Sequence, residues 1–513
     1  MSKLQTICLL GILALAVRGA WAQDNSAPPS TGDTPQDTRQ EPVPAYGQDN
    51  TAAPVSENPP LSGLDLPSLE PQAAPLSYLQ PGATVSESAL SNAGATLGGG
   101  GVSSLTTAVG SLTMKKLWSH YDLALDYIGG VGYYSLAGQG LESLQQMDFD
   151  QKINWKRGQL SLRDSFSYLP EGNFGGSYGS VGSQGIATLG NTAFGGFWGG
   201  SSLGNLGLAP RVLNVSLADV TQNFSSRSAI TLSGGYAFTH FYGKDVTGAS
   251  FIGSSQITAQ FGYNRTLTSH TQVALTYGYQ GFDFSVLGSA FHSHVIQGMY
   301  GHRISGRLDL LIGGGPQITL IDTQSAVCSQ AIVAPFYCEV FGGTLISKNV
   351  KQTNLGIAAQ GRLRYRFPKT SLDLEFQRFE TGGSGLFAGA QSNILSLNAS
   401  RPLSRTVSGF VNAGYSTNSM VQPLSFEQLI ACGRPASSQG ACPANNANSY
   451  NYFFFGGGLQ RPFGRNIHTY LSYQFNRLTF GDSFCGAGAC NRTSNQNLVT
   501  FGLDWTPRPI RID

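Results

Sequence analysis

The residues from 119 to 507 alternate between polar and apolar side chains in sixteen short stretches, whose connections switch regularly between long and short. We interpret these stretches as β-strands, with the first core near Tyr121 and the last near Asn497. The long connections are residues 170 to 210, 322 to 349, 419 to 447 and 481 to 494, among others. A membrane-spanning β-barrel has short turns at one rim and long loops at the other. The pattern therefore predicts an all-β fold, a transmembrane antiparallel β-barrel of about 16 strands.

The first 22 residues have the three parts of a secretory signal peptide. Lys3 supplies a charged start, residues 7 to 17 are apolar, and Ala20-Trp21-Ala22 forms a small-x-small cleavage site. The apolar part is too short to span a bilayer, and nothing later in the chain supplies 18 consecutive apolar residues. We predict a signal peptide over residues 1–22, and any membrane span must then be made of strands.

Residues 23–118 differ in composition from the rest and are predicted to be a disordered Pro/Ser/Ala-rich acidic periplasmic tail and linker. Between residues 23 and 100 there are nine acidic side chains and one arginine. Two roles stay open. The tail is a flexible spacer, or its acidic residues and its apolar patches Leu61 to Leu69 and Leu76 to Leu79 dock on a periplasmic partner or enter a basic lumen.

The remaining boundaries follow from the strand pattern. We assign residues 119–507 to the barrel and residues 508–513 to a C-terminal extension. An even number of strands places both termini in the periplasm.

Two hairpins indicate a polar interior. Around Arg157-Gly158, Trp155 is expected opposite Leu160 and Ile153 opposite Leu162, which makes one apolar face toward lipid. Around Pro368-Lys369, Arg364 is expected opposite Asp373 and Arg362 opposite Glu375. These four charged side chains lie on the face that points away from lipid. The predicted lumen charges are Asp148, Asp150, Lys152, Arg163, Arg362, Arg364, Arg366, Asp373 and Glu375. In this set the cations outnumber the acids by one, so we expect a weak preference for anions.

A barrel of sixteen strands is too wide for side chains to fill. The long loop over residues 170 to 210 carries the aromatic residues Phe194, Phe197 and Trp198 among many glycines. We predict that this loop folds inward and narrows the channel. The alternative is a mobile external loop.

Six cysteines remain after the predicted signal peptide, and they form three local pairs in the long loops. The pairs are Cys328 with Cys338, Cys432 with Cys442, and Cys485 with Cys490. Because each pair shares one loop, we predict local disulfides, each worth roughly 2 to 3 kcal/mol. No pair has the C-x-x-C spacing of a metal site, so no metal ligand is assigned.

The histidines give little support for an enzyme. His292-Ser293-His294 places two imidazoles on one face of a strand near the outer rim. Catalysis or a metal site there is the alternative, but no pattern typical of outer-membrane phospholipases follows. We predict no enzyme activity, no cofactor and no nucleic-acid partner.

By its architecture over residues 119–507, the chain resembles the porin-like outer-membrane β-barrels of Gram-negative bacteria. It is also similar to porins associated with exopolysaccharide loci. It departs from typical members because Trp505, in the last strand, is followed by residues 507 to 513 rather than by the chain end.

The resemblance implies a channel for small hydrophilic solutes in the cell outer membrane. The alternatives are a barrel for surface polysaccharide export and a closed structural or adhesive barrel with disulfide-stiffened external loops. Outer-membrane lipid, lipopolysaccharide and the barrel-assembly machinery are the implied partners. Oligomerisation and the solute stay open.

Overall fold

The structure, a computed structural model, describes residues 60–62, 77–91, 101–135, 140–169, 211–242, 252–284, 289–328, 345–382, 388–421, 449–481 and 493–512. All of them belong to one compact unit, Pro44–Asp513. In these segments no helix has the length and apolar character needed to cross a membrane.

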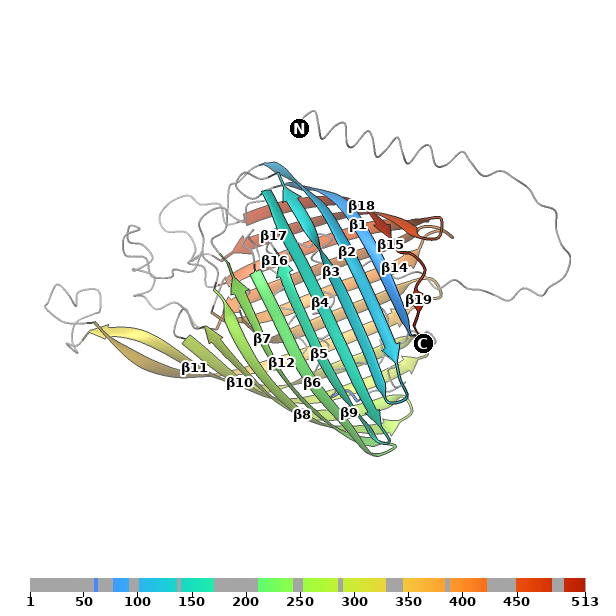
Figure 1. The fold of residues 1–513 in the computed structure, drawn as a ribbon. Coiled ribbons are helices and arrows are strands. Elements are labelled where there is room, and N and C mark those ends of the chain that lie inside the picture. Colours follow the sequence, from blue (N-terminus) through green and yellow to red (C-terminus); the bar gives the residue numbers. More distant parts are fainter. Residues whose placement is uncertain are drawn as a thin grey trace, which may run out of the picture. The chain divides into compact units, whose positions relative to one another are not determined.

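The described residues form eighteen antiparallel strands in one closed sheet, together with a short nineteenth strand (Figure 1). The strands are β1 (Tyr78–Ser91), β2 (Val102–Leu117), β3 (Tyr121–Tyr134), β4 (Gly140–Trp155), β5 (Gly158–Leu169), β6 (Arg211–Ser225), β7 (Ser228–Phe241), β8 (Ser254–Thr268), β9 (Thr271–Phe284), β10 (Ser289–Ser305), β11 (Leu308–Cys328), β12 (Leu345–Arg366), β13 (Ser371–Thr381), β14 (Ala390–Pro402), β15 (Ser408–Met420), β16 (Ser449–Phe463), β17 (Ile467–Phe480), β18 (Thr493–Trp505) and β19 (Ile510–Arg511). Each strand pairs with the next, and β1 also pairs with β18. The sheet is therefore a closed barrel.

Alternation along each strand builds two different surfaces. In β9, Gln272 and Thr276 are 6% and 3% exposed, whereas Leu275 and Tyr277 are 59% and 45% exposed. Because successive side chains point to opposite faces of a strand, the first pair faces the barrel interior and the second pair faces outward.

The two rims differ as predicted. Connections from even to odd strands are tight turns such as Lys156-Arg157 and Ser269-His270. Connections from odd to even strands lie at the opposite rim. Since β1 begins and β18 ends at the rim of tight turns, both ends of the barrel chain lie there. One long connection is shorter than expected, because β11 and β12 extend through part of residues 322 to 349 and project beyond the neighbouring strands (Figure 1).

The predicted count of 16 strands is two too few. The sixteen predicted cores correspond to β3 to β18, while β1 and β2 lie inside residues 23–118, the range assigned to tail and linker. The reason is the small size of the side chains in β1. Ala83 and Val85 face outward while Thr84 and Ser86 face inward, so the alternation has little hydrophobic contrast.

The predicted register is correct in one hairpin and wrong in the other. In β12–β13, Arg364 lies opposite Asp373 and Arg362 opposite Glu375, as expected. In β4–β5, Ile153 lies opposite Leu160 rather than Leu162, because the turn is Lys156-Arg157. A shift of two residues leaves every side chain on its predicted face.

The C-terminal extension is part of the sheet. Arg511 pairs with Tyr78 and Ile510 with Leu79, so β19 lies against the start of β1 where β18 has ended. The amide of Ile512 donates to the carbonyl of Ser77 at 3.2 Å.

Candidate functional site: the barrel lumen

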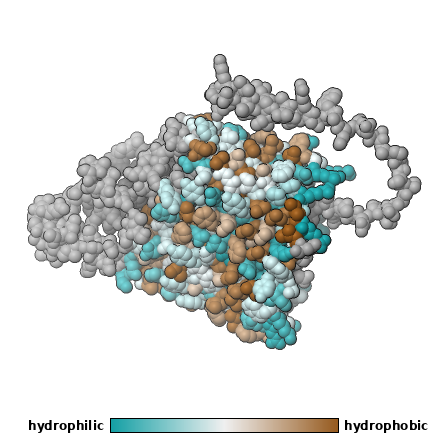
Figure 2. Space-filling model, in the orientation of Figure 1, coloured by the Kyte–Doolittle hydropathy of each residue, from teal (hydrophilic) through white to brown (hydrophobic). Residues whose placement is uncertain are grey.

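The inner face of the barrel is mainly polar. Examples of buried polar side chains from around the ring are Thr84 (3% exposed), Ser161 (2%), Thr231 (1%), Ser392 (0%) and Thr500 (0%). The outer face is apolar, with large exposed side chains such as Ile257, Leu355, Leu471 and Phe501. Figure 2 shows hydrophobic residues over the outer wall and the most hydrophilic ones toward the rim of tight turns.

One charged cluster lies on the inner face of β4 and β5. The Asp150 carboxylate lies 3.9 Å from Lys152 Nζ and 3.7 Å from Arg163 Nε. Asp148 accepts hydrogen bonds from Ser165 Oγ at 2.5 Å and from Gln146 Nε2 at 2.8 Å. The four predicted lumen charges of this hairpin are therefore together and share hydrogen-bond donors.

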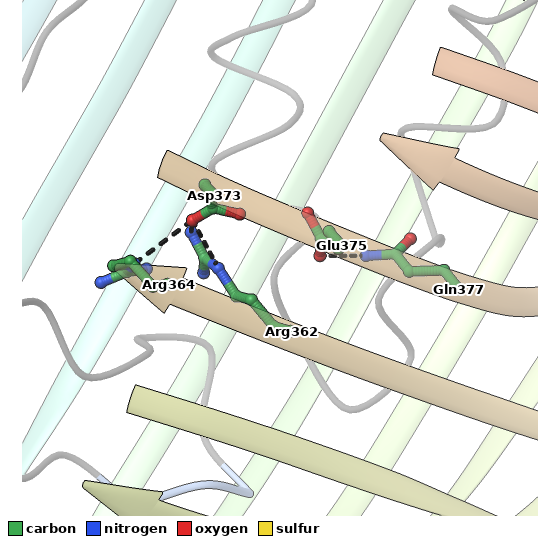
Figure 3. Close-up of polar contacts among 5 residues, drawn as sticks. All are labelled: Arg362, Arg364, Asp373, Glu375 and Gln377. Atoms are coloured by element: carbon green, nitrogen blue, oxygen red, sulfur yellow. Dashed lines mark hydrogen bonds and ion pairs between the residues drawn. The ribbon is translucent and has the colours of Figure 1, made fainter. Parts of the chain in front are cut away.

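A second charged cluster lies on β12 and β13 (Figure 3). Asp373 Oδ2 accepts hydrogen bonds from Arg362 Nη2 at 2.7 Å, from Arg362 Nε at 2.9 Å and from Arg364 Nε at 3.2 Å. Glu375 accepts one from Gln377 Nε2 at 2.5 Å. Asp373 thus binds both arginines, although the backbone register places Arg362 opposite Glu375. Arg366 follows the same alternation on β12.

The two clusters lie on facing walls, because β4 and β13 are nine positions apart in a ring of eighteen strands. Sequence reasoning missed other charges on the inner face, although they follow the same alternation. They are the cations Arg211 and Arg303 and the acids Asp219, Asp309 and Asp504. Asp122 and Asp126 of β3 follow the same alternation, since they lie opposite Lys152 and Asp148. These acids remove the excess of cations on which the expected anion preference depended.

Two buried apolar clusters narrow the lumen. The first, here called the cross-lumen cluster, comprises Leu213, Val215, Leu217, Ala237, Val295 and Ala358. These residues come from β6, β7, β10 and β12. Since β6 and β7 pair with neither β10 nor β12, the two walls touch across the interior.

The second cluster lies near the rim of long loops and comprises Ile252, Phe282, Phe284, Phe291, Ile321, Ala388 and Val421. Three of its members belong to connections between strands. Loop ends therefore pack against the inner aromatic residues of β9 and β10. Neither cluster was predicted.

A short segment that precedes β1 is bound inside the barrel. Leu61 and Ser62 are 2% and 0% exposed. The Leu61 amide donates to Asn264 Oδ1 at 3.1 Å. The Ser62 carbonyl accepts from Thr231 Oγ1 and from Gln260 Nε2, both at 2.9 Å.

The wall is shaped to hold this segment. The Leu61 side chain packs against Ala274, Met299 and Leu311. A Cβ at Gly262 would lie 2.4 Å from Ser62 Cβ, and one at Gly301 would lie 3.0 Å from the methyl groups of Leu61. Glycine at these two positions therefore leaves room for the segment, which a larger residue would not. Leu61 belongs to the tail for which a flexible spacer was predicted, with docking on a partner or entry into a basic lumen as the alternative, and the structure places it in the lumen.

The other predicted site residues lie outside the described parts. The loop aromatics Phe194, Phe197 and Trp198 are among them, as are five of the six cysteines. For the sixth, Cys328, only the backbone is described, as the last residue of β11. The inward loop and the three disulfides stay predictions.

His292 and His294 both lie on the outer face of β10. Each accepts or donates a hydrogen bond at 2.9 Å with a tyrosine of β9, His292 with Tyr279 and His294 with Tyr277. Ser293, between them, faces the lumen and is 0% exposed. The geometry therefore does not join these residues as nucleophile and base. Among the described residues there is no group of three or more histidine, cysteine or acidic side chains that could hold a metal ion.

Comparison with known proteins adds little to this picture. No family model matches the chain, and no curated protein matches it. Similar solved structures include the outer membrane protein OpdK of Pseudomonas aeruginosa, at 9% identity, with 84% of this chain and 98% of that chain covered and a TM-score of 0.38. OccK5 (OpdH) of the same species has 12% identity, coverage of 85% and 100%, and a TM-score of 0.36. The ferric-catecholate import receptor Fiu of E. coli K12 has 8% identity, coverage of 85% and 82%, and a TM-score of 0.38. At such scores function has to be argued from this chain's own residues.

Proposed function

We propose that this chain is an outer-membrane channel for small hydrophilic solutes. The observation that carries the proposal is the closed eighteen-strand barrel with an apolar outer face and a polar inner face. A closed sheet has no unpaired edge, so it satisfies its backbone hydrogen bonds in lipid. A barrel of this size encloses more space than wall side chains can fill.

The rims suggest an orientation. In outer-membrane barrels the short turns are periplasmic and the long loops are external. We therefore propose that the rim of tight turns, with both ends of the barrel chain, faces the periplasm. The predicted signal peptide at residues 1–22 is consistent with export, and the predicted disulfides suit long loops in an oxidising compartment.

We further propose that the channel rests in a narrow state. The cross-lumen cluster brings two walls together, and the segment Pro60–Ser62 occupies the interior near Asn264 and Leu311. The contacts of the cross-lumen cluster break when the two walls separate. Those of the segment break when it leaves the lumen. The tail would then act as a gate entering from the periplasmic rim.

The second candidate is a closed barrel with a structural or adhesive role, and the cross-lumen cluster is the observation that favours it. Export of a surface polysaccharide is a further alternative, and it would require the two walls of the cross-lumen cluster to separate. Single-channel recording of the purified full-length protein in a planar bilayer separates the candidates. We expect small, steady KCl currents with transitions to larger ones, whereas a barrel that carries no steady current would refute the channel.

A further inference from the structure

A groove lies on the outer wall of the barrel near the rim of tight turns. Its floor includes Gly409 of β15 and Gly457 of β16, and exposed leucines line it, namely Leu403, Leu459 and Leu471. A Cβ at Gly409 would lie 3.1 Å from Leu403 Cδ1 and 3.4 Å from Leu459 Cδ2, so these two side chains stand over the glycine. The groove measures about 600 Å³, which is within the range of ligand sites.

The lining of this groove is apolar except at the end next to the turns. Among the described residues that line it, Arg401 of β14 is the one with a charged side chain. The other polar residues of the lining carry hydroxyl groups and no charge, and they are Thr370, Ser400, Ser472 and Tyr473. The Tyr473 hydroxyl donates to Asn497 Oδ1 at 2.8 Å. The groove therefore combines an apolar floor with a single cation and no acid.

Aromatic and basic residues fix the depth of the groove in a membrane. Phe463 and Trp505 end the outer faces of β16 and β18 and are exposed, as in the aromatic girdles of outer-membrane barrels. Beyond them, the turns β12–β13, β14–β15 and β16–β17 contain Lys369, Arg405 and Arg465 and no acidic residue. The groove thus lies on the hydrocarbon side of the girdle, and the cations lie on the headgroup side.

A second arginine stands beside Arg401 at this level. Arg461 is the next outward-facing residue of β16 after Leu459, toward the turns. Its guanidinium group lies over the Phe463 ring, 5.1 Å from the ring centre. In the ion pairs between described residues, neither Arg401 nor Arg461 takes part. Two arginines without a counter-charge, above an apolar groove, match a headgroup phosphate and its acyl chain.

We propose that this groove binds one anionic phospholipid, with an acyl chain between the leucines and the phosphate at Arg401 and Arg461. The proposed orientation of the barrel places this lipid in the periplasmic leaflet. A zwitterionic lipid brings an ammonium group of its own, which the same arginines repel, so the site selects a net negative headgroup. The site requires a barrel in a membrane but not an open channel.

The test uses the purified full-length protein in detergent with an equimolar mixture of phosphatidylglycerol and phosphatidylcholine that carry the same acyl chains. Native mass spectrometry counts the lipids that stay bound. We expect the wild type to retain one phosphatidylglycerol in preference to phosphatidylcholine. Arg401→Gln should lower this preference about fivefold, the contribution of about one cation near anionic lipid. The control Arg227→Gln, in the β6–β7 turn of the same rim, should match the wild type.

A second pair of variants tests the apolar part of the site. Gly457→Leu places a side chain in the floor, so the bound phosphatidylglycerol should be lost. Gly298→Leu, on the outer face of β10, is the matched control, because no atom lies within 4 Å of its added Cβ.

Three results overturn the site. The first is equal retention of the two lipids by the wild type. The second is an equal loss in Arg401→Gln and Arg227→Gln, because the charge of the whole rim would then be responsible. The third is unchanged retention in a folded Gly457→Leu. If Gly457→Leu fails to fold, as judged by heat-modifiable gel mobility, the variant Arg401→Gln/Arg461→Gln decides: loss of the preference supports the site, and an unchanged preference overturns it. A barrel that carries no current refutes the channel and leaves these results as they are.

Discussion

At the scale of single residues, Asp373 is the centre of the lumen charges on β12 and β13. One of its oxygens accepts from both Arg362 and Arg364. The two guanidinium groups are held close together by the acid that lies between them. Their repulsion is screened only as long as that carboxylate is charged.

The variant Asp373→Asn should therefore shift the channel toward anions. Removal of the carboxylate leaves two cations without their shared counter-charge on the wall of a narrow pore. Reversal potentials in a KCl gradient measure the change, which should be larger at low salt because ions screen wall charges. The matched control is Asp283→Asn, on the outer face of β9. An unchanged reversal potential in Asp373→Asn would show that the cluster lies off the ion path.

Residue pairs also show how far sequence reasoning reaches. Opposite charges at Arg364 and Asp373 fix both face and register, because a slip would separate them. The β4–β5 hairpin has apolar residues at many successive outward positions, so registers two residues apart look alike. The faces were predictable there, but the pairs were not.

At the scale of elements, β6 shows why the narrowing of the lumen was not predictable. Its inward side chains Leu213, Val215 and Leu217 are apolar, while Asn214 and Ser216 face outward. Taken alone, the pattern indicates the opposite orientation, with the apolar face toward lipid. Only the contact with Val295 and Ala358 across the barrel explains the inversion.

The segment Pro60–Ser62 gives a test of gating. In Gly262→Ala the added Cβ would collide with Ser62, so we expect release of the segment and a larger conductance in planar bilayers. Gly298→Ala on β10 is the matched control, because no atom lies within 4 Å of its added Cβ. Equal conductance of the two variants would mean that the segment leaves the ion path open or stays bound.

The short strand β19 should contribute to stability. Removal of residues 510–513 deletes the pairs of Ile510 and Arg511 with the start of β1, so about 1–3 kcal/mol of unfolding free energy should be lost. The transition between folded and heated forms on gels, followed against temperature, reports the loss. Deletion of residue 513 alone is the control. No difference between the two truncations would indicate that the start of β1 is secured by β2 alone.

At the scale of the whole molecule, the alternation of long and short connections was sufficient to predict a closed antiparallel barrel and sixteen of its strands. The first two strands were hidden because their small side chains resemble the tail in composition. The state of the lumen depends on contacts between strands that are distant in the ring, and no local pattern encodes such contacts.

The cross-lumen cluster predicts the effect of a smaller side chain. Val215 is 0% exposed at the meeting of the two walls. Val215→Ala should raise conductance because the passage widens, and should lower stability by about 1–3 kcal/mol through lost packing. Val212→Ala, on the outer face of the same strand, should change conductance little. A lower conductance in Val215→Ala would mean that the walls close further when the side chain shrinks.

The pairing of β1 with β18 has a consequence for biogenesis. Ser88 Oγ and Thr500 Oγ1 form a hydrogen bond of 2.9 Å across this seam, 412 positions apart in the chain. Neighbouring hairpins can form early, but the seam joins the first strand to the last, and such non-local pairing is slow. Until the last strand is present, β1 has an unpaired edge that can recruit other strands. Closure of the barrel therefore has to be one of the last steps of its assembly.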